Sequence, residues 1–362
     1  MRITLFINHN NLKYPKAGYY DSAKKSEPAC DFVSFQKNTS AGNILKKFDC
    51  APDAYGDVLL LNGKILDRAC KRIDKAGTMQ EIIKILSDYK MFFQPVEAKM
   101  FEYFERFSKD NPHLTLPDCL RGLYDDALAR LKIEEFKVLD EVDRLSNDMS
   151  PKTALDVRYK TTYCRDIIIA NREDERFKRK NLLLYLDQMN PLEDEKEAYE
   201  KMRDRALYLP TSSTSENAFI VKYADRSQNE IAKRLLRASV ATVEHIKPDH
   251  LGGKNALSNF ILASAAMNSL RGHLSLAKFV ERFSFIPACC QKYIEAIIAD
   301  LNRGGILRGH EAYPYQVKRN LYKESNGFIN LDLTSYKYSY RESFEAEREF
   351  AKRKKSKTRR VR

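Results

Sequence analysis

Residues 243–271 read VEHIKPDHLGGKNALSNFILASAAMNSLR, and this stretch decides the fold. The segment that leads into it, residues 239–246, is rich in β-branched side chains and stops before Pro248, which cannot donate to a central strand. A glycine pair, Gly252 and Gly253, then suits a turn, so a second short strand can form over residues 259–262. We therefore expect a hairpin here.

Strong helix formers follow the hairpin from Ala263 onward. Their apolar members recur at helical spacing as far as Val280, at Met267, Leu270, Leu274, Ala277, Phe279 and Val280. The whole stretch thus predicts strand, loop, strand and helix, with one helix packed on the hairpin.

Three polar residues lie where this scaffold can bring them together. Glu244 and His245 end the first strand, and Asn268 lies early on the helix, so a carboxylate, an imidazole and an amide oxygen can converge. A hard cation such as Mg²⁺ prefers oxygen ligands and keeps positions open for water and phosphate. Hydrolysis of a phosphodiester needs a base to deprotonate water and positive charge on the developing phosphorane. One histidine and one cation meet both needs.

The spacing from His245 to Asn259 is fourteen residues and from Asn259 to Asn268 nine, which resembles the HNH (ββα-metal) endonuclease motif. It is similar in particular to the HNH domain of RNA-guided CRISPR effector nucleases. The resemblance implies that His245 is the general base and that Glu244 and Asn268 bind Mg²⁺ or Mn²⁺. It further implies that Asn259 holds the loop and orients the histidine.

Two positions depart from the usual family pattern. The family more often has Asp where this chain has Glu244, and Asn268 at the third position makes the chain an HNN variant. Paired Cys-x-x-Cys motifs do not flank the stretch, so we expect no structural zinc.

Basic residues indicate a polyanionic partner. The formal net charge is +13, and residues 352–362 carry eight Lys or Arg and no acid, so we expect a disordered phosphate-binding tail. Arg271 lies three residues after Asn268 and shares its helix face, where it can bind a phosphate. The other expected nucleic-acid contacts are Lys233, Arg237, Lys247, Lys254, Lys354 and Arg359.

Helical periodicity governs most of the remaining chain. It predicts helices over residues 79–93, 96–107, 116–145, 154–170, 192–207, 227–238 and 288–302. Further strands are expected at residues 3–7, 57–61, 218–223 and 331–340. The fold class is thus α+β, a mainly helical protein with an embedded ββα-metal HNH nuclease module.

Four domains follow from these patterns and from the polar segment TSSTSEN at residues 211–217. Residues 1–210 form a mixed, then helical region that selects the target, binds a partner protein or regulates access. Residues 211–285 form the nuclease domain, residues 286–351 a helix and strand extension, and residues 352–362 the basic tail.

Composition excludes several other classes of protein. With 43% hydrophobic and 31% charged residues the chain is globular, and no run of apolar residues is long enough for a membrane span. Its seven cysteines are scattered without a disulfide or metal-binding pattern, which favours a reducing cytoplasm.

We therefore expect a cytoplasmic, metal-dependent endonuclease that hydrolyses DNA, with a role in restriction or anti-phage defence. The alternative is an inactive HNH-fold protein that binds nucleic acid without cutting it, and RNA is an alternative substrate. A single ββα site cuts one strand, so double-strand cutting would require a homodimer.

Overall fold

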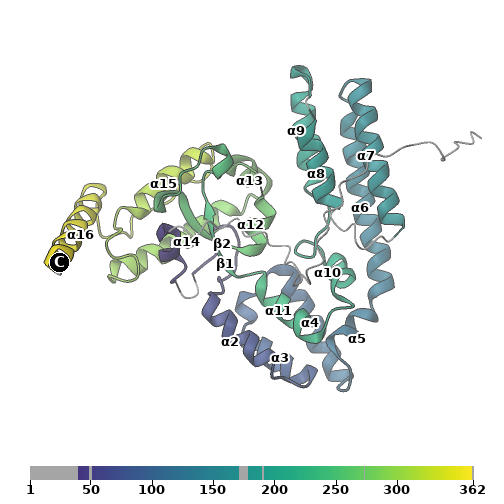
Figure 1. Cartoon of the computed structure of the whole chain (residues 1–362), viewed down its shortest axis with the longest axis horizontal. Helices are drawn as coiled ribbons and strands as arrows, with labels where there is room; N and C mark the ends of the chain where they lie inside the picture. Colours follow the sequence, from purple (N-terminus) through teal and green to yellow (C-terminus); the bar gives the residue numbers. More distant parts are fainter. Residues whose placement is uncertain (1–39, 49–50, 171–177, 190, 273, 361–362) are drawn as a thin grey trace, which may run out of the picture. The chain divides into compact units, whose positions relative to one another are not determined.

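The computed structural model describes residues 40–48, 51–170, 178–189, 191–272 and 274–360. In this part of the chain helices dominate, and the named strands form one two-stranded antiparallel sheet of β1 (Ala241–His245) and β2 (Phe260–Ser264) (Figure 1). The predicted mainly helical fold with a small sheet is confirmed. The strand expected at residues 3–7 lies outside the described residues.

The described helices include those that periodicity predicts between residues 79 and 170, with a break where α5 gives way to α6. In chain order they are α1 (Ser40–Leu45), α2 (Gly63–Ile73), α3 (Met79–Ser87), α4 (Pro95–Asp110), α5 (Leu116–Arg121), α6 (Tyr124–Ser146), α7 (Pro151–Ile169), α8 (Lys178–Gln188), α9 (Lys196–Ala206), α10 (Glu216–Tyr223), α11 (Gln228–Arg237), α12 (Ala265–Arg271), α13 (Leu276–Arg282), α14 (Ile286–Asn302), α15 (Tyr313–Glu324) and α16 (Tyr340–Arg360). None of them is both long and apolar enough to cross a membrane.

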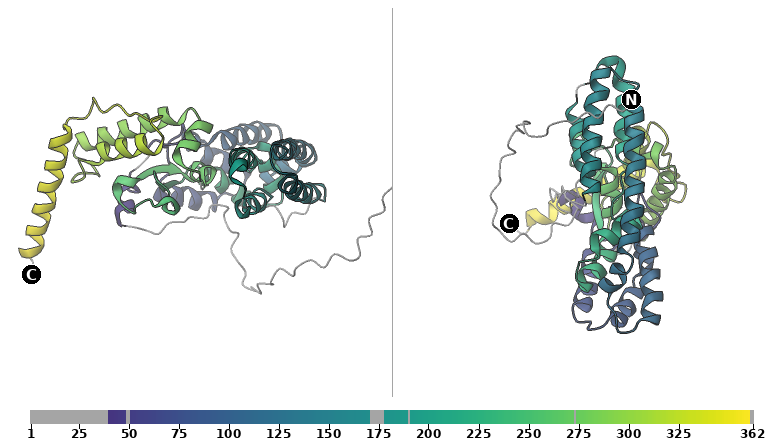
Figure 2. Two further views of the ribbon diagram at one scale, coloured as in Figure 1. Left: turned by 90° about the horizontal axis from the view of Figure 1, so that it is seen from above. Right: turned by 90° about the vertical axis from the view of Figure 1, so that its right-hand side faces the viewer.

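Three hydrophobic cores organise these helices. Core one surrounds the sheet and takes its residues from α1, the segment after it, Leu207, and the chain from Ile246 to Tyr336. Core two joins α2–α5 to α10 and α11. Core three lies inside α6–α9, which pack as neighbouring helices, drawn in teal in Figure 2. Core two therefore runs across the boundary that the sequence predicts at residue 210.

A segment far upstream in the sequence covers the sheet at both edges. The Ala54 amide donates to the Leu262 carbonyl on the outer edge of β2 at 3.0 Å. Leu61 pairs with the start of β1: its amide donates to the Ser239 carbonyl at 2.7 Å, and its carbonyl accepts from the Ala241 amide at 3.0 Å. We call residues 51–61 the strap, because they satisfy edge groups of both strands.

The strand predicted at residues 57–61 is therefore wrong. In that segment the structure has only isolated bridges, Pro52 with Leu59 and Leu61 with Val240. The apolar residues of this segment contribute to core one and core two, although the segment forms no regular ladder of strand hydrogen bonds.

The single helix predicted after the hairpin is also wrong. α12 ends at Gly272, whose φ of 54° lies in the left-handed region that favours glycine. α13 begins again after Ser275, whose hydroxyl accepts from the Lys278 amide at 3.4 Å. The break forms a bend, across which the Leu274 amide donates to the Arg271 carbonyl at 3.0 Å.

Two other strand predictions are wrong for a shared reason, since a short apolar run fits more than one structure. Residues 218–223 belong to helix α10, whose N-cap Ser215 accepts from the Ala218 amide at 3.3 Å. Residues 331–339 are irregular, and their tyrosines anchor them: the Tyr336 hydroxyl donates to the Glu311 carbonyl at 2.7 Å.

The basic tail is not the disordered segment that we predicted. α16 extends from Tyr340 to Arg360 and so includes most of residues 352–362. Glu and Arg side chains four apart support its exposed face, as in the Arg341–Glu345 pair at 2.7 Å.

Candidate functional site

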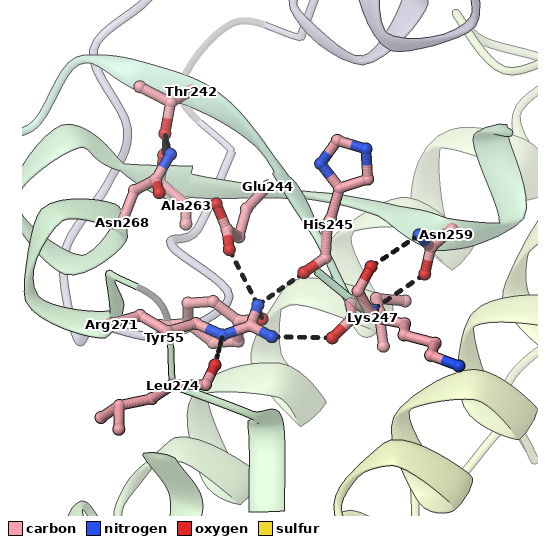
Figure 3. Close-up of polar contacts among 11 residues, drawn as sticks. Tyr55, Thr242, Glu244, His245, Lys247, Asn259, Ala263, Asn268, Arg271 and Leu274 are labelled. Atoms are coloured by element: carbon pink, nitrogen blue, oxygen red, sulfur yellow. Dashed lines mark hydrogen bonds and ion pairs between the residues drawn. The ribbon is translucent and has the colours of Figure 1, made fainter. Parts of the chain in front are cut away.

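The end of β1 presents Glu244 and His245 on opposite sides of the strand (Figure 3). Glu244 Oε1 lies 2.8 Å from Arg271 Nη1, and its side chain is only 12% exposed. His245 is half-buried: Nε2 lies 2.8 Å from Asn255 Oδ1, and the ring packs edge-on against Phe260. The two neighbours in sequence therefore make separate contacts.

Arg271 is the largest of the fully buried side chains, with no exposed surface. Besides Glu244, it donates through Nη1 to the Tyr55 hydroxyl at 2.8 Å and to the His245 carbonyl at 2.5 Å. Its remaining donors reach the carbonyls of Ile246 through Nη2 and Leu274 through Nε (Figure 3).

This burial contradicts the prediction that Arg271 binds a phosphate. The guanidinium contacts one carboxylate, one hydroxyl and three carbonyls, so its donors are directed into the protein. Arg271 instead joins the end of β1 to the strap and to the bend after α12.

The Glu244 carboxyl lies in an environment that disfavours its ionised form. Burial raises its pKa from 4.5 to about 7, although the charge and hydrogen bond of Arg271 act in the opposite direction. A buried carboxylate that has one cationic partner can accept a second cation, since its other oxygen still has lone pairs to offer.

Asn259 fastens the loop between the two strands. Its Oδ1 accepts from the Lys247 amide at 2.9 Å, and its Nδ2 donates to the Lys247 carbonyl at 3.0 Å (Figure 3). The same Nδ2 also donates to the Lys254 carbonyl at 3.0 Å. The Asn259 carbonyl also accepts from the Ile246 amide at 2.8 Å, next to His245. These contacts agree with the loop-holding part of its predicted role.

Gly253 lets the same loop close on itself. A Cβ at this position would lie 1.8 Å from the Lys247 carbonyl oxygen, so no side chain fits. Its neighbour Gly252 has a φ of 82° and open space around it. Glycine is favoured there by the left-handed backbone conformation, since a side chain would meet no neighbouring atom.

Asn268 projects from α12 and its Nδ2 donates to the Thr242 hydroxyl at 3.1 Å. Its Oδ1 accepts no hydrogen bond from any residue that the structure describes. Glu244, His245 and Asn268 thus have three different partners, Arg271, Asn255 and Thr242, and no hydrogen bond described by the structure joins any two of the three.

The predicted nucleic-acid contacts have mixed surroundings. Lys233 is mostly covered and its Nζ lies 2.5 Å from Asp74, so it is already paired. Lys254 is exposed on the loop, whereas Lys247 and Arg237 are half-buried. Lys354 and Arg359 lie on α16, but their side chains fall outside the part that the structure describes.

Sequence reasoning missed the residues that complete these pairings. Thr242 and Asn255 lie within or beside the motif. Their polar side chains, close in sequence to Glu244 and His245, could have indicated them as partners. Tyr55 lies on the strap, and no local pattern connects it with Arg271.

A cation would have a limited set of protein ligands here. Among the described residues, no group of three or more His, Cys, Asp or Glu side chains could hold a metal ion. Glu244 and Asn268 offer two hard oxygen donors, which fits Mg²⁺ or Mn²⁺ only if water and phosphate supply the other ligands.

Comparisons with models of protein families, with curated proteins and with solved structures found no match for this chain.

Proposed function

We propose that the chain is a metal-dependent endonuclease of the HNH kind, which hydrolyses phosphodiester bonds of DNA. The observation that supports it is the order β1, loop, β2, α12, with Glu244 and His245 ending β1, Asn259 fastening the loop and Asn268 on the helix. The sequence spacing that resembles the family is thus accompanied by the elements that the motif needs.

In this proposal His245 accepts the proton of the attacking water. The His245 side chain is half-buried, and its Nε2 has a hydrogen bond with Asn255, an exposed residue of the loop. When a water molecule replaces Asn255 as the hydrogen-bond partner of His245, only one exposed hydrogen bond is lost, so the free-energy cost is small. Asn259 keeps the backbone directly after the histidine, at Ile246 and Lys247, in place during that exchange.

Mg²⁺ or Mn²⁺ would be held by Glu244 and Asn268, and when bound it would stabilise the charge that develops on the phosphorane. Glu244 Oε1 would keep its contact with Arg271, and the other oxygen of the carboxylate would bind the cation. The cation would thus be a second positive partner of the same carboxylate.

The competing proposal is an HNH-fold protein that binds nucleic acid and does not cut it. The Glu244–Arg271 ion pair favours it, because an arginine already neutralises the carboxylate that would bind the metal. The role in restriction or anti-phage defence stays a prediction from the sequence.

The test is cleavage of supercoiled plasmid DNA in Mg²⁺ or Mn²⁺ by the full chain and by His245→Ala. We expect the variant to cut at least about 100-fold more slowly, which is the lower range for loss of a general base. His250→Ala, on the exposed part of the same loop, is the matched control and should cut normally.

DNA binding is measured in parallel by gel mobility, and we expect it to be equal for the parent and His245→Ala. If both bind and neither cuts, the binding-protein proposal replaces the endonuclease. If structured RNA is cut and DNA is not, the proposed substrate is wrong, but the proposed hydrolysis of phosphodiester bonds is retained.

A further inference from the structure

α7 is apolar on two faces. Val157, Cys164 and Ile168 lie in core three, as a helix of the α6–α9 group requires. On the outer face Leu155, Tyr159 and Tyr163 are 67%, 63% and 46% exposed. They follow one another at intervals of four residues and form one stripe, which we call the outer stripe. A contiguous exposed stripe of large apolar side chains marks an interaction surface.

The outer stripe has an internal symmetry about Tyr159. Leu155 lies four residues before Tyr159 and Tyr163 four residues after it. Exposed charges of opposite sign lie seven residues away on either side, Lys152 before and Asp166 after. Seven residues are close to two full turns, so both charges are on the same face as Tyr159.

A hollow adjoins one end of the outer stripe. Its volume is about 250 Å³, and it lies between α7 and α8, with Tyr163, Leu184 and Tyr185 among its lining residues. Lys160 covers the Tyr185 ring with its Nζ 4.6 Å from the centroid, and Leu184 is itself 53% exposed. The hollow can accept an aliphatic side chain that arrives at the level of Tyr163.

We propose that the outer stripe binds the outer stripe of a second copy of this chain, antiparallel, around a two-fold axis at Tyr159. In that arrangement Leu155 of each copy lies at the level of Tyr163 of the other, beside the hollow. Lys152 of each copy faces Asp166 of the other, so two ion pairs close the interface. An isologous interface needs a surface that is complementary to itself, and this one is.

The charges select the antiparallel arrangement over a parallel one. A parallel pair would place Lys152 against Lys152 and Asp166 against Asp166, and like charges across an interface weaken it. The proposal is independent of the nuclease activity. If that activity holds, the dimer would carry two sites, one for each strand of a duplex.

The first test measures the mass of the full chain in solution by sedimentation equilibrium at low salt. We expect a dimer, with at least tenfold weaker association in Lys152→Asp and in Asp166→Lys, each tested alone. The double variant with both changes should recover the association of the parent, because reversing both partners restores opposite charges. Lys254→Asp, an exposed charge reversal elsewhere, should leave association unchanged.

The second test is a cross-link. Tyr159→Cys should form a disulfide-linked dimer on mild oxidation, since the axis brings the two copies of residue 159 together. Leu155→Cys should form much less, because residue 155 faces residue 163 of the other copy. The parent chain under the same oxidation is the background. A monomer at every concentration, or single variants that the double variant fails to rescue, overturns the proposal.

Discussion

Arg271 shows how one residue joins distant parts of the chain. A buried guanidinium is costly unless its donors are satisfied, and here five acceptors from the strap, β1 and the bend after α12 satisfy them. Tyr55 contributes one of these acceptors, and its ring also lies beside the guanidinium at 5.5 Å. The arginine therefore stabilises the end of β1 from the inside of the protein.

We predict that Arg271→Ala lowers the free energy of unfolding by about 3–5 kcal/mol, as expected when one partner of a buried ion pair is removed. Tyr55→Phe removes a single hydrogen bond and should cost about 1 kcal/mol. Urea unfolding followed by circular dichroism measures both. Lys254→Ala, an exposed cation on the loop, should change nothing. An Arg271→Ala protein as stable as the parent would show that the five contacts contribute no net stability.

At the scale of elements, the loop between β1 and β2 depends on two glycines for different reasons. Gly252 is required because its backbone is left-handed. Gly253 is required because a Cβ at that position would clash with the Lys247 carbonyl oxygen. Asn259 then joins the two ends of the loop through its amide. The position of His245 relative to the hairpin depends on this closed loop.

We predict that Gly253→Ala destabilises the protein more than Gly252→Ala, because the clash with the backbone oxygen forces the loop open. Gly252→Ala should cost about 1–2 kcal/mol, the penalty for a left-handed alanine. Gly252→Asn should cost less, since asparagine tolerates that region. Thermal unfolding measures the melting temperature of each of the three variants and so gives their order of stability. Equal losses for both alanine variants would mean that the loop adapts around residue 253.

At the scale of the molecule, the sheet does not belong to one continuous segment. The strap supplies hydrogen bonds to both strand edges, and core one mixes α1 with residues from the C-terminal third. Core two, in turn, takes α10 and α11 from beyond residue 210. A nuclease domain limited to residues 211–285 would therefore expose surfaces of two cores.

We predict that residues 211–285 expressed alone do not fold. Their sheet would lack the strap, and α10 and α11 would lack α2–α5 to pack against. Circular dichroism and heat-induced unfolding should show no cooperative transition. Residues 35–362, which form one compact unit, are the control and should unfold cooperatively. A folded fragment of residues 211–285 would mean that the sequence-based boundary is also a folding boundary.

The sequence predicted those parts of the fold that depend on near neighbours. The hairpin follows from β-branched residues around a glycine turn, and the loop-holding contacts of Asn259 span at most twelve residues. Arg271 was misread because helical spacing tells which face it shares with Asn268, but not whether that face is buried. The strap could not be predicted, since its partners lie about two hundred residues away.

The strap also has a consequence for synthesis on the ribosome. Ala54 leaves the ribosome 208 residues before its partner Leu262 (262 − 54). At roughly 5–20 residues per second, the delay is on the order of 10–40 s. During this time Tyr55 and Leu60, which are 0% and 1% exposed in the folded protein, have no sheet to pack against. The nascent chain thus carries an unpaired apolar segment until its C-terminal third emerges.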